Sequence, residues 1–281
     1  MLTPHLTSSD GTAKFLFGLQ DQRFVESVLV PFANRDAVCL SSQVGCAMKC
    51  SFCHTGLMGL TRSLSAEEMI QQYQAVRDWL RQTRPERPAP NIVFMGQGEP
   101  LHNFAALKDA VRWFTDPHKG KLGPRQITVS TAGHLPGIER FNELGGVNFA
   151  LSLHSPFDDE RSRLIPLNQR WPLEVIFAAI KNIKLRSQQF INCEYLVIKG
   201  LNHSAAHARA LAERLAGTPA IVNLIPFNSF PGAPWETPSE EEVEGFKREL
   251  VAQRLRVFRR TTKGAEILAA CGQLNTKELH A

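Results

Sequence analysis

The stretch Cys46-Ala47-Met48-Lys49-Cys50-Ser51-Phe52-Cys53 places three cysteines at the spacing C-x3-C-x2-C. A loop of this length can fold three thiolates around one cubane 4Fe–4S cluster. Three ligands for four irons leave one iron open, and that iron can chelate the amino and carboxylate groups of S-adenosylmethionine for one-electron cleavage of the sulfonium. The spacing leaves one other interpretation open, a zinc knuckle with His54 as the fourth ligand.

Six short apolar segments surround this loop, one before it and five after it, and helix-period sequence separates them. Strands that are apolar throughout are typical of a parallel sheet buried on both faces. The pattern predicts an α/β fold, a partial (βα)6 parallel barrel with ligands at the carboxyl ends of its strands. The predicted strands are Ala37–Leu40, Asn91–Met95, Gln126–Ser130, Val147–Ser152, Ile191–Ile198 and Ile221–Ile225.

Two shorter segments flank the barrel, which we expect to occupy residues 39–235. Residues 1–38 are expected to form a short N-terminal β extension that includes the strand Val25–Pro31. Residues 236–281 are expected to form a C-terminal extension of one helix and one strand. Thr237-Pro238-Ser239-Glu240 matches a capping box, so we expect the helix to begin there and to precede a strand at Leu255–Phe258.

The composition is that of a globular protein, since 43% of the 281 residues are hydrophobic and 21% are charged. No stretch approaches the roughly 20 apolar residues that span a bilayer, and the first residues do not resemble a signal peptide. We therefore expect a cytoplasmic protein without a membrane partner. The net charge of 32 − 27 = +5 is compatible with a polyanionic partner.

Six further strings accompany the cysteine loop: SSQVGC (Ser41–Cys46), MGQGEP (Met95–Pro100), STAG (Ser130–Gly133), SLH (Ser152–His154), NLIPFN (Asn223–Asn228) and ACGQL (Ala270–Leu274). Together they resemble the radical-SAM RNA adenine methyltransferase family that includes RlmN and Cfr, and RlmN more closely. The resemblance covers nearly everything from about Ser8 to Leu274. It implies a barrel of the radical-SAM type and a 4Fe–4S cluster on Cys46, Cys50 and Cys53.

The resemblance also implies that S-adenosylmethionine binds at the carboxyl ends of the barrel strands. The residue types agree with this, because a glycine lets the backbone approach a ligand and a glutamate can accept hydrogen bonds from an ammonium group. The residues that the resemblance assigns to this cofactor are Gly98, Glu99, Ser130, Ser152, Leu153, His154 and Asn228.

Two cysteines outside the loop, Cys39 and Cys271, have roles that the resemblance implies. Cys271 accepts a methyl group from a first S-adenosylmethionine, and a radical derived from a second one abstracts hydrogen from it. The carbon radical adds to an adenine ring, carbon 2 being favoured over carbon 8. Cys39 then forms a transient disulfide with Cys271 and releases the product. Glu26 aligns with the family's proposed proton acceptor, the alternative being an exposed strand glutamate.

RNA is the partner that the resemblance implies, ribosomal RNA first and transfer RNA as a further substrate, with a flavodoxin or ferredoxin as electron donor. Five cations and no acid between Arg254 and Lys263 favour a phosphate-contacting strip beside Cys271, and a solvated basic face is the alternative. Members of the family usually carry a small helical domain before the catalytic core. Only 38 residues precede Cys39, so we expect that domain to be absent.

Two other classes of protein are compatible with the cysteine loop. A radical-SAM enzyme of another reaction type, such as a protein-radical activase, would have no use for both Cys39 and Cys271. A non-catalytic RNA-binding protein with a structural metal would hold zinc rather than iron, and it would cleave no cofactor.

Replacing Cys46, Cys50 or Cys53 by alanine is expected to abolish cluster binding, because each thiolate holds a different iron. After anaerobic reconstitution, each variant should lose the visible charge-transfer absorption and the production of 5′-deoxyadenosine. Cys193→Ala, which changes a cysteine expected in the core, is the control and should retain both. A triple variant that still bound a full cluster would contradict the assignment.

Overall fold

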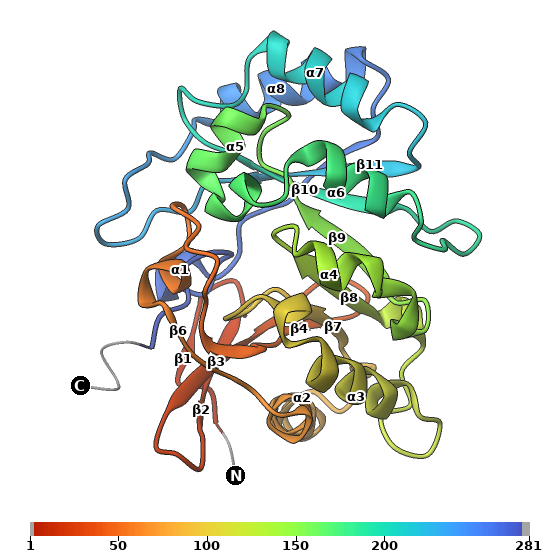
Figure 1. Ribbon diagram of the computed structural model, residues 1–281. Helices are drawn as coiled ribbons and strands as arrows, with labels where there is room; N and C mark the ends of the chain where they lie inside the picture. The colour runs from red at the N-terminus through yellow and green to blue at the C-terminus, as the bar shows by residue number, and fades with distance from the viewer. Residues whose placement is uncertain (1–2, 277–281) are drawn as a thin grey trace.

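The computed structural model describes residues 3–276. One sheet of ten strands runs through the chain in the order β1-β2-β3-β4-β7-β8-β9-β10-β11-β12, and β5 pairs with β6 in a separate hairpin (Figure 1). The strands are β1 (Leu6–Thr7), β2 (Ala13–Gly18), β3 (Phe24–Val30), β4 (Ala37–Cys39), β5 (Gln43–Gly45), β6 (Leu60–Ser63), β7 (Asn91–Phe94), β8 (Ile127–Thr131), β9 (Asn148–Ser152), β10 (Ile191–Val197), β11 (Ala220–Pro226) and β12 (Val257–Arg259).

The helices alternate with the central strands. They are α1 (His54–Met58), α2 (Ala66–Thr83), α3 (Phe104–Thr115), α4 (Leu135–Glu139), α5 (Asp158–Leu164), α6 (Leu173–Ile180), α7 (Ala205–Leu215) and α8 (Glu240–Ala252). Short 3-10 turns lie at Pro100–Asn103, Pro124–Gln126, Phe141–Leu144, Pro166–Gln169 and Ala265–Ile267.

The central strands β4, β7, β8, β9, β10 and β11 are parallel and follow chain order. The α/β partial barrel is therefore confirmed, and the six predicted strands agree with the observed ones to within one residue at each end. The antiparallel strands β1, β2 and β3 extend one edge of the sheet, and β12 extends the other in parallel with β11. The sheet thus continues through both flanking segments.

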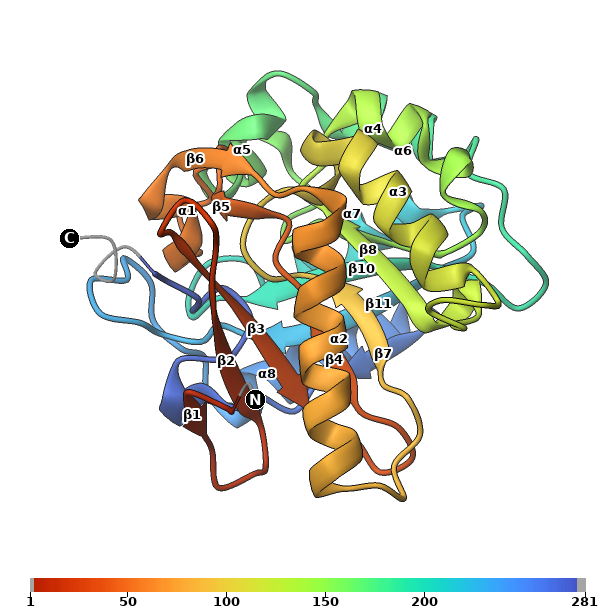
Figure 2. The same ribbon diagram turned by 90° about the horizontal axis from the view of Figure 1, so that it is seen from below.

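Most of the helices lie on the outer face of the curved sheet (Figure 2). The longest, α2, begins at a capping box between Ser65 and Glu68. Its buried residues Met69, Tyr73 and Val76 recur at helical spacing and pack into the main core. In the described part of the chain, no helix combines the length and the apolar character needed to cross a membrane.

The structure corrects the predicted start of the last helix. Ser239, rather than Thr237, is the N-cap of α8, because its hydroxyl accepts from the amide of Glu242 and the Glu242 carboxylate accepts from the amide of Ser239. Residues 237–240 and residues 239–242 both match the capping-box pattern. The later one places three glutamates in the first turn, where negative charge stabilises a helix N-terminus.

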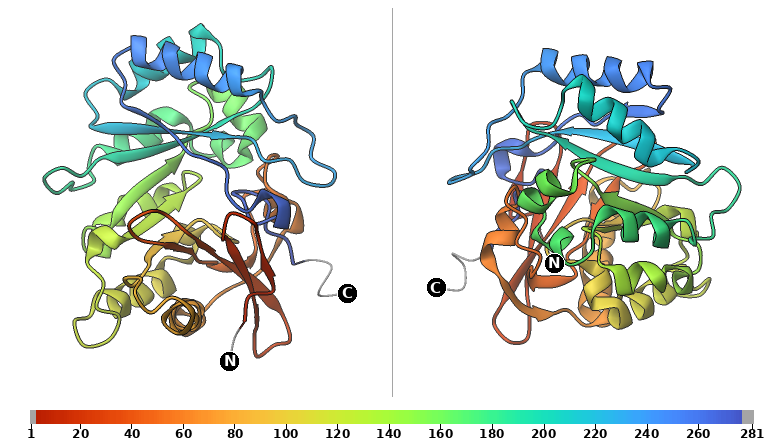
Figure 3. Two further views of the ribbon diagram at one scale, coloured as in Figure 1. Left: turned by 180° about the vertical axis from the view of Figure 1, so that it is seen from behind. Right: turned by 45° about the horizontal axis from the view of Figure 1, so that its top comes forward.

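After β12 the chain returns to the N-terminal strands and to α1 (Figure 3). The amide of Gly264 donates to Asp10 Oδ2 at 3.0 Å, and the amide of His54 donates to the carbonyl of Gly272 at 2.6 Å. These contacts bring Cys271 next to the cysteine loop, although the two are far apart in sequence.

Arg161, at the middle of α5, is a fully buried cation that ties two strand ends together. Its guanidinium donates to the carbonyls of Leu153 at 3.0 Å, Ala132 at 2.7 Å and Ser152 at 2.9 Å. A further bond reaches Asn168 Oδ1 at 2.6 Å. Burial lowers the pKa of Arg161 to about 10, so the group stays charged at neutral pH.

Arg161→Met is expected to lower the free energy of unfolding by about 3–5 kcal/mol, because it leaves buried carbonyl groups without donors. Chemical denaturation of the cluster-free protein measures this loss. Arg163→Met changes an exposed arginine on the same helix and should shift the free energy by less than about 0.5 kcal/mol. Equal stability of Arg161→Met and wild type would show that these carbonyls do not depend on the guanidinium.

Candidate active site

Two adjoining cavities open at the carboxyl ends of the central strands. The larger has a volume of about 370 Å³ and is bounded mainly by β3, β4 and the C-terminal segment. The smaller has a volume of about 150 Å³ and lies over the cysteine loop. The residues that line both cavities are Cys53, Met95, Gly96, Ile225, Arg260, Cys271 and Gly272.

The smaller cavity is lined by all three cysteines of the loop. Cys46 directly follows β5, and Cys53 is the N-cap of α1, so regular structure fixes both ends of the loop. Gly45 has a φ of 75°, and a Cβ on it would lie 1.8 Å from the carbonyl oxygen of Gly59. Only glycine fits the point where the hairpin meets the loop.

The three thiols fit an iron–sulfur cluster better than a single zinc ion. Burial raises the pKa of each thiol, so a cationic group is needed to hold three thiolates together. Within residues 3–276, no three Cys, His, Asp or Glu side chains converge on a position that could hold one metal ion. The ring of His54 stacks on Phe230 at 4.7 Å and its Nε2 lies 2.8 Å from Asn275 Nδ2, while its buried Nδ1 has no hydrogen-bond partner in the described part of the chain.

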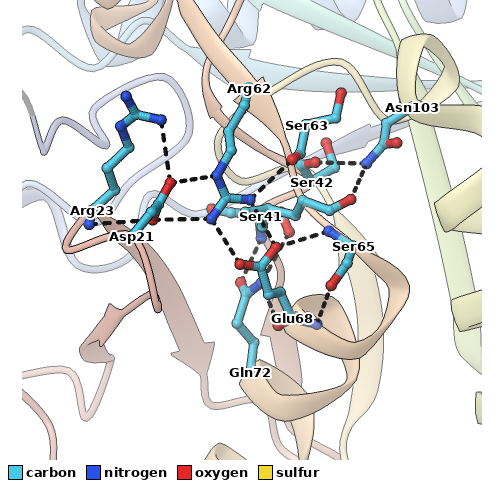
Figure 4. Close-up of polar contacts among 11 residues, drawn as sticks. Asp21, Arg23, Ser41, Ser42, Arg62, Ser63, Ser65, Glu68, Gln72 and Asn103 are labelled. Atoms are coloured by element: carbon cyan, nitrogen blue, oxygen red, sulfur yellow. Dashed lines mark hydrogen bonds and ion pairs between the residues drawn. The ribbon is translucent and has the colours of Figure 1, made fainter.

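The string that precedes the loop is held in place by hydrogen bonds, as Figure 4 shows. The hydroxyl of Ser41 donates to the carbonyl of Glu26 at 2.6 Å, and its amide donates to Gln72 Oε1 at 3.0 Å. Asn103 Nδ2 donates to the carbonyl of Ser42 at 3.0 Å. These buried serines position the backbone that leads into the cysteine loop.

Gly98 and Glu99 line the smaller cavity next to the cysteines. A Cβ on Gly98, which has a φ of 101°, would lie 2.5 Å from the Gln43 side chain. The buried Glu99 accepts from the amides of Leu101 at 3.0 Å and Ala132 at 2.8 Å. Burial nevertheless raises the pKa of its carboxyl to about 7. A carboxylate in this position would be stabilised by an ammonium group.

Ser130, Ser152 and His154 line the same cavity from the ends of β8 and β9. His154 has a φ of 60°, and its Nδ1 accepts from the amide of Leu196 at 3.0 Å. Burial lowers the pKa of His154 to about 3, so its ring is neutral. The ring packs edge-on against Phe52 of the cysteine loop, with centroids 4.6 Å apart.

Three residues expected at the site lie away from the smaller cavity. Leu153 is buried in the main core, and Asn228 lines the larger cavity. Glu26 is buried as well, so it is not an exposed strand glutamate. Its Oε1 lies 2.9 Å from Lys14 Nζ, and its Oε2 accepts from the amide of Asn275 at 2.9 Å. Its role as proton acceptor stays a prediction.

Cys39 and Cys271 line the same larger cavity, although 271 − 39 = 232 positions separate them. Cys271 is exposed and also lines the smaller cavity, whereas Cys39 is half-buried at the end of β4. Burial raises the pKa of Cys39 to about 12, and the neighbouring Cys271 adds to this effect. Cys193 is fully buried in the main core, in agreement with its expected packing role.

The basic strip between Arg254 and Lys263 is partly neutralised within the chain. Arg259 forms ion pairs with two glutamates of α8. Arg260, which lines both cavities, pairs with the buried Glu194 at 3.4 Å. The sequence could not reveal these pairs because the acidic partners come from distant elements.

Two buried glutamines support the site and were missed by sequence reasoning. Gln43 Oε1 accepts from the amide of Glu99 at 2.9 Å. Gln97 Oε1 accepts from the amide of Glu26 at 2.9 Å, and its Nε2 donates to Thr276 Oγ1 at 3.2 Å. Both stand inside the strings SSQVGC and MGQGEP, so a polar residue within a motif was the available signal.

Comparisons with known proteins agree with this geometry. Residues 40–211 match the model of the Radical SAM superfamily. The crystal structure of a radical SAM methyltransferase from Sphaerobacter thermophilus matches with a TM-score of 0.91 and 42% identity, over 98% of this chain and 81% of that chain. The chain belongs to the radical SAM superfamily.

The curated relatives of the chain identify a narrower family within this superfamily. The dual-specificity RNA methyltransferase RlmN of Geotalea uraniireducens is 41% identical over 267 residues, which cover 95% of this chain and 76% of that protein. The dual-specificity RNA methyltransferase RlmN 2 of Myxococcus xanthus is 42% identical over 272 residues, which cover 96% of this chain and 72% of that protein. Within the superfamily, the chain is a member of the RlmN-type methyltransferases, as the strings predicted.

Glu99→Gln is expected to weaken the binding of S-adenosylmethionine roughly ten- to a hundredfold, because a hydrogen bond to a charged group is worth about 1.5–3 kcal/mol. Calorimetric titration of the reconstituted protein measures the Kd, and the visible spectrum checks that the cluster is retained. Glu67→Gln changes an exposed glutamate of α2 and should bind like wild type. Unchanged affinity in Glu99→Gln would show that Gly98 and Glu99 form a turn and do not bind S-adenosylmethionine.

Proposed function

We propose that this chain is an RNA methyltransferase that methylates an adenine ring carbon, carbon 2 in preference to carbon 8, through a methyl group carried on Cys271. The observation that carries the proposal is that Cys271 is exposed and lines both cavities. A sulfur there can take a methyl group from a donor in the smaller cavity and present it to a base in the larger one. The names of the relatives support RNA as the substrate, with ribosomal RNA first and transfer RNA second.

Two groups that the superfamily requires would occupy the smaller cavity. Cys46, Cys50 and Cys53 would hold a 4Fe–4S cluster, while Glu99 and the strand ends would hold S-adenosylmethionine. When both groups are bound and a flavodoxin or ferredoxin reduces the cluster, S-adenosylmethionine supplies a methyl group and a 5′-deoxyadenosyl radical. These two uses imply two S-adenosylmethionine per turnover. Glu99 orients the ammonium group, and the neutral His154 completes the wall without adding charge.

The two cysteines differ in ways that suit two roles. The exposed Cys271 is accessible for nucleophilic attack on a sulfonium methyl group. Burial raises the pKa of the Cys39 thiol to about 12, which disfavours its thiolate and so disfavours methylation at this sulfur.

Product release then uses Cys39. The Cys39 thiol gives up its proton as its sulfur attacks the Cys271 sulfur, an S–S bond forms, and the bond from the Cys271 sulfur to the methylene carbon breaks. The methylene carbon receives the electron pair and the proton of the Cys39 thiol and becomes the methyl group. A cellular dithiol restores the two free cysteines.

Glu26 remains our candidate acceptor of the ring proton. It lies on β3 two residues before Val28 and four before Val30, both of which line the larger cavity. Side chains at this spacing share one face of a strand. Both oxygens of its carboxylate are engaged, one by Lys14 and one by the amide of Asn275, so proton transfer would require one of these contacts to open first.

The alternatives fit the geometry less well. A radical SAM enzyme of another reaction type would not need Cys39 and Cys271 at one cavity. A zinc-containing RNA-binding protein would need ligands that converge on one ion, and within residues 3–276 no three Cys, His, Asp or Glu side chains do so.

Cys271→Ala and Cys39→Ala are expected to fail in different ways. Cys271→Ala should form no RNA adduct, because it has no sulfur to carry the methylene group. Cys39→Ala should still methylate Cys271 and attack the adenine, yet remain covalently attached to RNA. A denaturing gel shows the adduct as a shifted band that nuclease removes, and mass spectrometry shows the methylated cysteine.

Total ribosomal and transfer RNA serve as substrates in this experiment, with wild-type enzyme and Cys193→Ala as controls that should turn over. A purely structural pair of cysteines would leave both variants inactive and free of adduct. That outcome, with active wild-type enzyme beside it, would refute the roles proposed for Cys39 and Cys271.

A further inference from the structure

The wall of the larger cavity includes an exposed aromatic ring. Phe32 lies in the loop between β3 and β4, lines the cavity and is 46% exposed. A single exposed phenylalanine on a protein surface needs no special explanation. Phe32 differs because its ring borders the cavity that also contains Cys39 and Cys271.

The main chain around Phe32 is fixed by an ion pair between a buried carboxylate and a partly exposed guanidinium. The Arg87 guanidinium pairs with the fully buried Asp36 and donates to the carbonyls of Phe32 and Ala33. The amide of Phe32 donates to the same Asp36 carboxylate at 3.4 Å. These contacts fix the main chain of the loop before any ligand binds. A ligand that stacks on the ring therefore loses little binding free energy to ordering of the backbone.

The surroundings of the ring combine apolar surface with positive charge. Val28, Val30 and Ala37 form an apolar wall, and the half-buried Lys263 lines the same cavity. The volume of about 370 Å³ lies in the range of small-ligand sites. A ligand with a flat, weakly polar face and an attached negative charge fits this combination, and a nucleotide has both.

We propose that Phe32 is a stacking platform for an unpaired RNA base that enters the larger cavity. The inference rests on the proposed function, because it takes RNA as the substrate and this cavity as its site. Aromatic side chains commonly hold unpaired bases by stacking. Phe32 is then a positioning residue: it orients the base relative to Cys271 and takes no part in bond making.

The test uses a short single-stranded oligouridylate RNA that carries one 2-aminopurine, whose fluorescence is quenched when it stacks on a ring. Wild-type, anaerobically reconstituted protein should bind and quench it. Phe32→Leu keeps apolar surface but removes the ring, and it should weaken binding roughly five- to a hundredfold and abolish the quenching. Phe32→Trp should retain both. Phe157→Leu, which changes an exposed phenylalanine that lines neither cavity, is the control and should match wild type.

Undiminished affinity and quenching in Phe32→Leu would overturn the inference, and so would an equal loss in Phe157→Leu. Mass spectrometry of Cys271 on the same protein preparations, after incubation with S-adenosylmethionine and a reductant, separates this outcome from failure of the proposed function, because methylation of that cysteine needs no RNA. Absence of methyl-Cys271 in wild-type protein would refute the proposed methyl carrier, while the fluorescence result would still decide the role of Phe32.

Discussion

The main-chain hydrogen bond from His54 to Gly272 joins the end of the cysteine loop to the turn that carries Cys271. Its length is 2.6 Å, and the rest of the site depends on it, because here the two cavities meet. Gly272 has a φ of 82°, and a Cβ on it would lie 3.2 Å from the carbonyl oxygen of Phe52. The close approach of the two segments therefore favours glycine at this position.

The charges of the smaller cavity are balanced by groups from several elements. Burial raises the pKa of Cys50, and Arg161 is the cation that opposes this effect. The same guanidinium holds the carbonyls at the ends of β8 and β9, so it links the strand ends to the electrostatics of the cysteine loop. Glu99, also buried, faces the cavity and accepts hydrogen bonds from neutral donors, the amides of Leu101 and Ala132 and the Thr131 side chain.

The sequence predicted the repeating part of the fold and the motif residues, and the reasons are physical. The apolar composition of strands such as Ile191–Val197 is enough to predict that they are buried. The spacing of the cysteines in Cys46–Cys53 is enough to predict the kind of group that they bind. The antiparallel strand β2 and the hairpin of β5 and β6 were missed because their patterns are short and mixed. Long-range pairings, such as Glu26 with Lys14 or Arg260 with Glu194, depend on tertiary packing and have no local signature.

The contact between residues 54 and 272 spans 272 − 54 = 218 positions, and this separation has a consequence for the order of folding. Closing so long a loop is entropically unfavourable until the intervening strands have paired. The cysteine loop closes locally against its own hairpin, whereas the turn with Cys271 can dock only on a nearly finished barrel. During synthesis Cys39 and Cys271 are therefore expected to stay apart while the barrel forms, so that premature pairing between them is disfavoured until the cysteine loop is already enclosed.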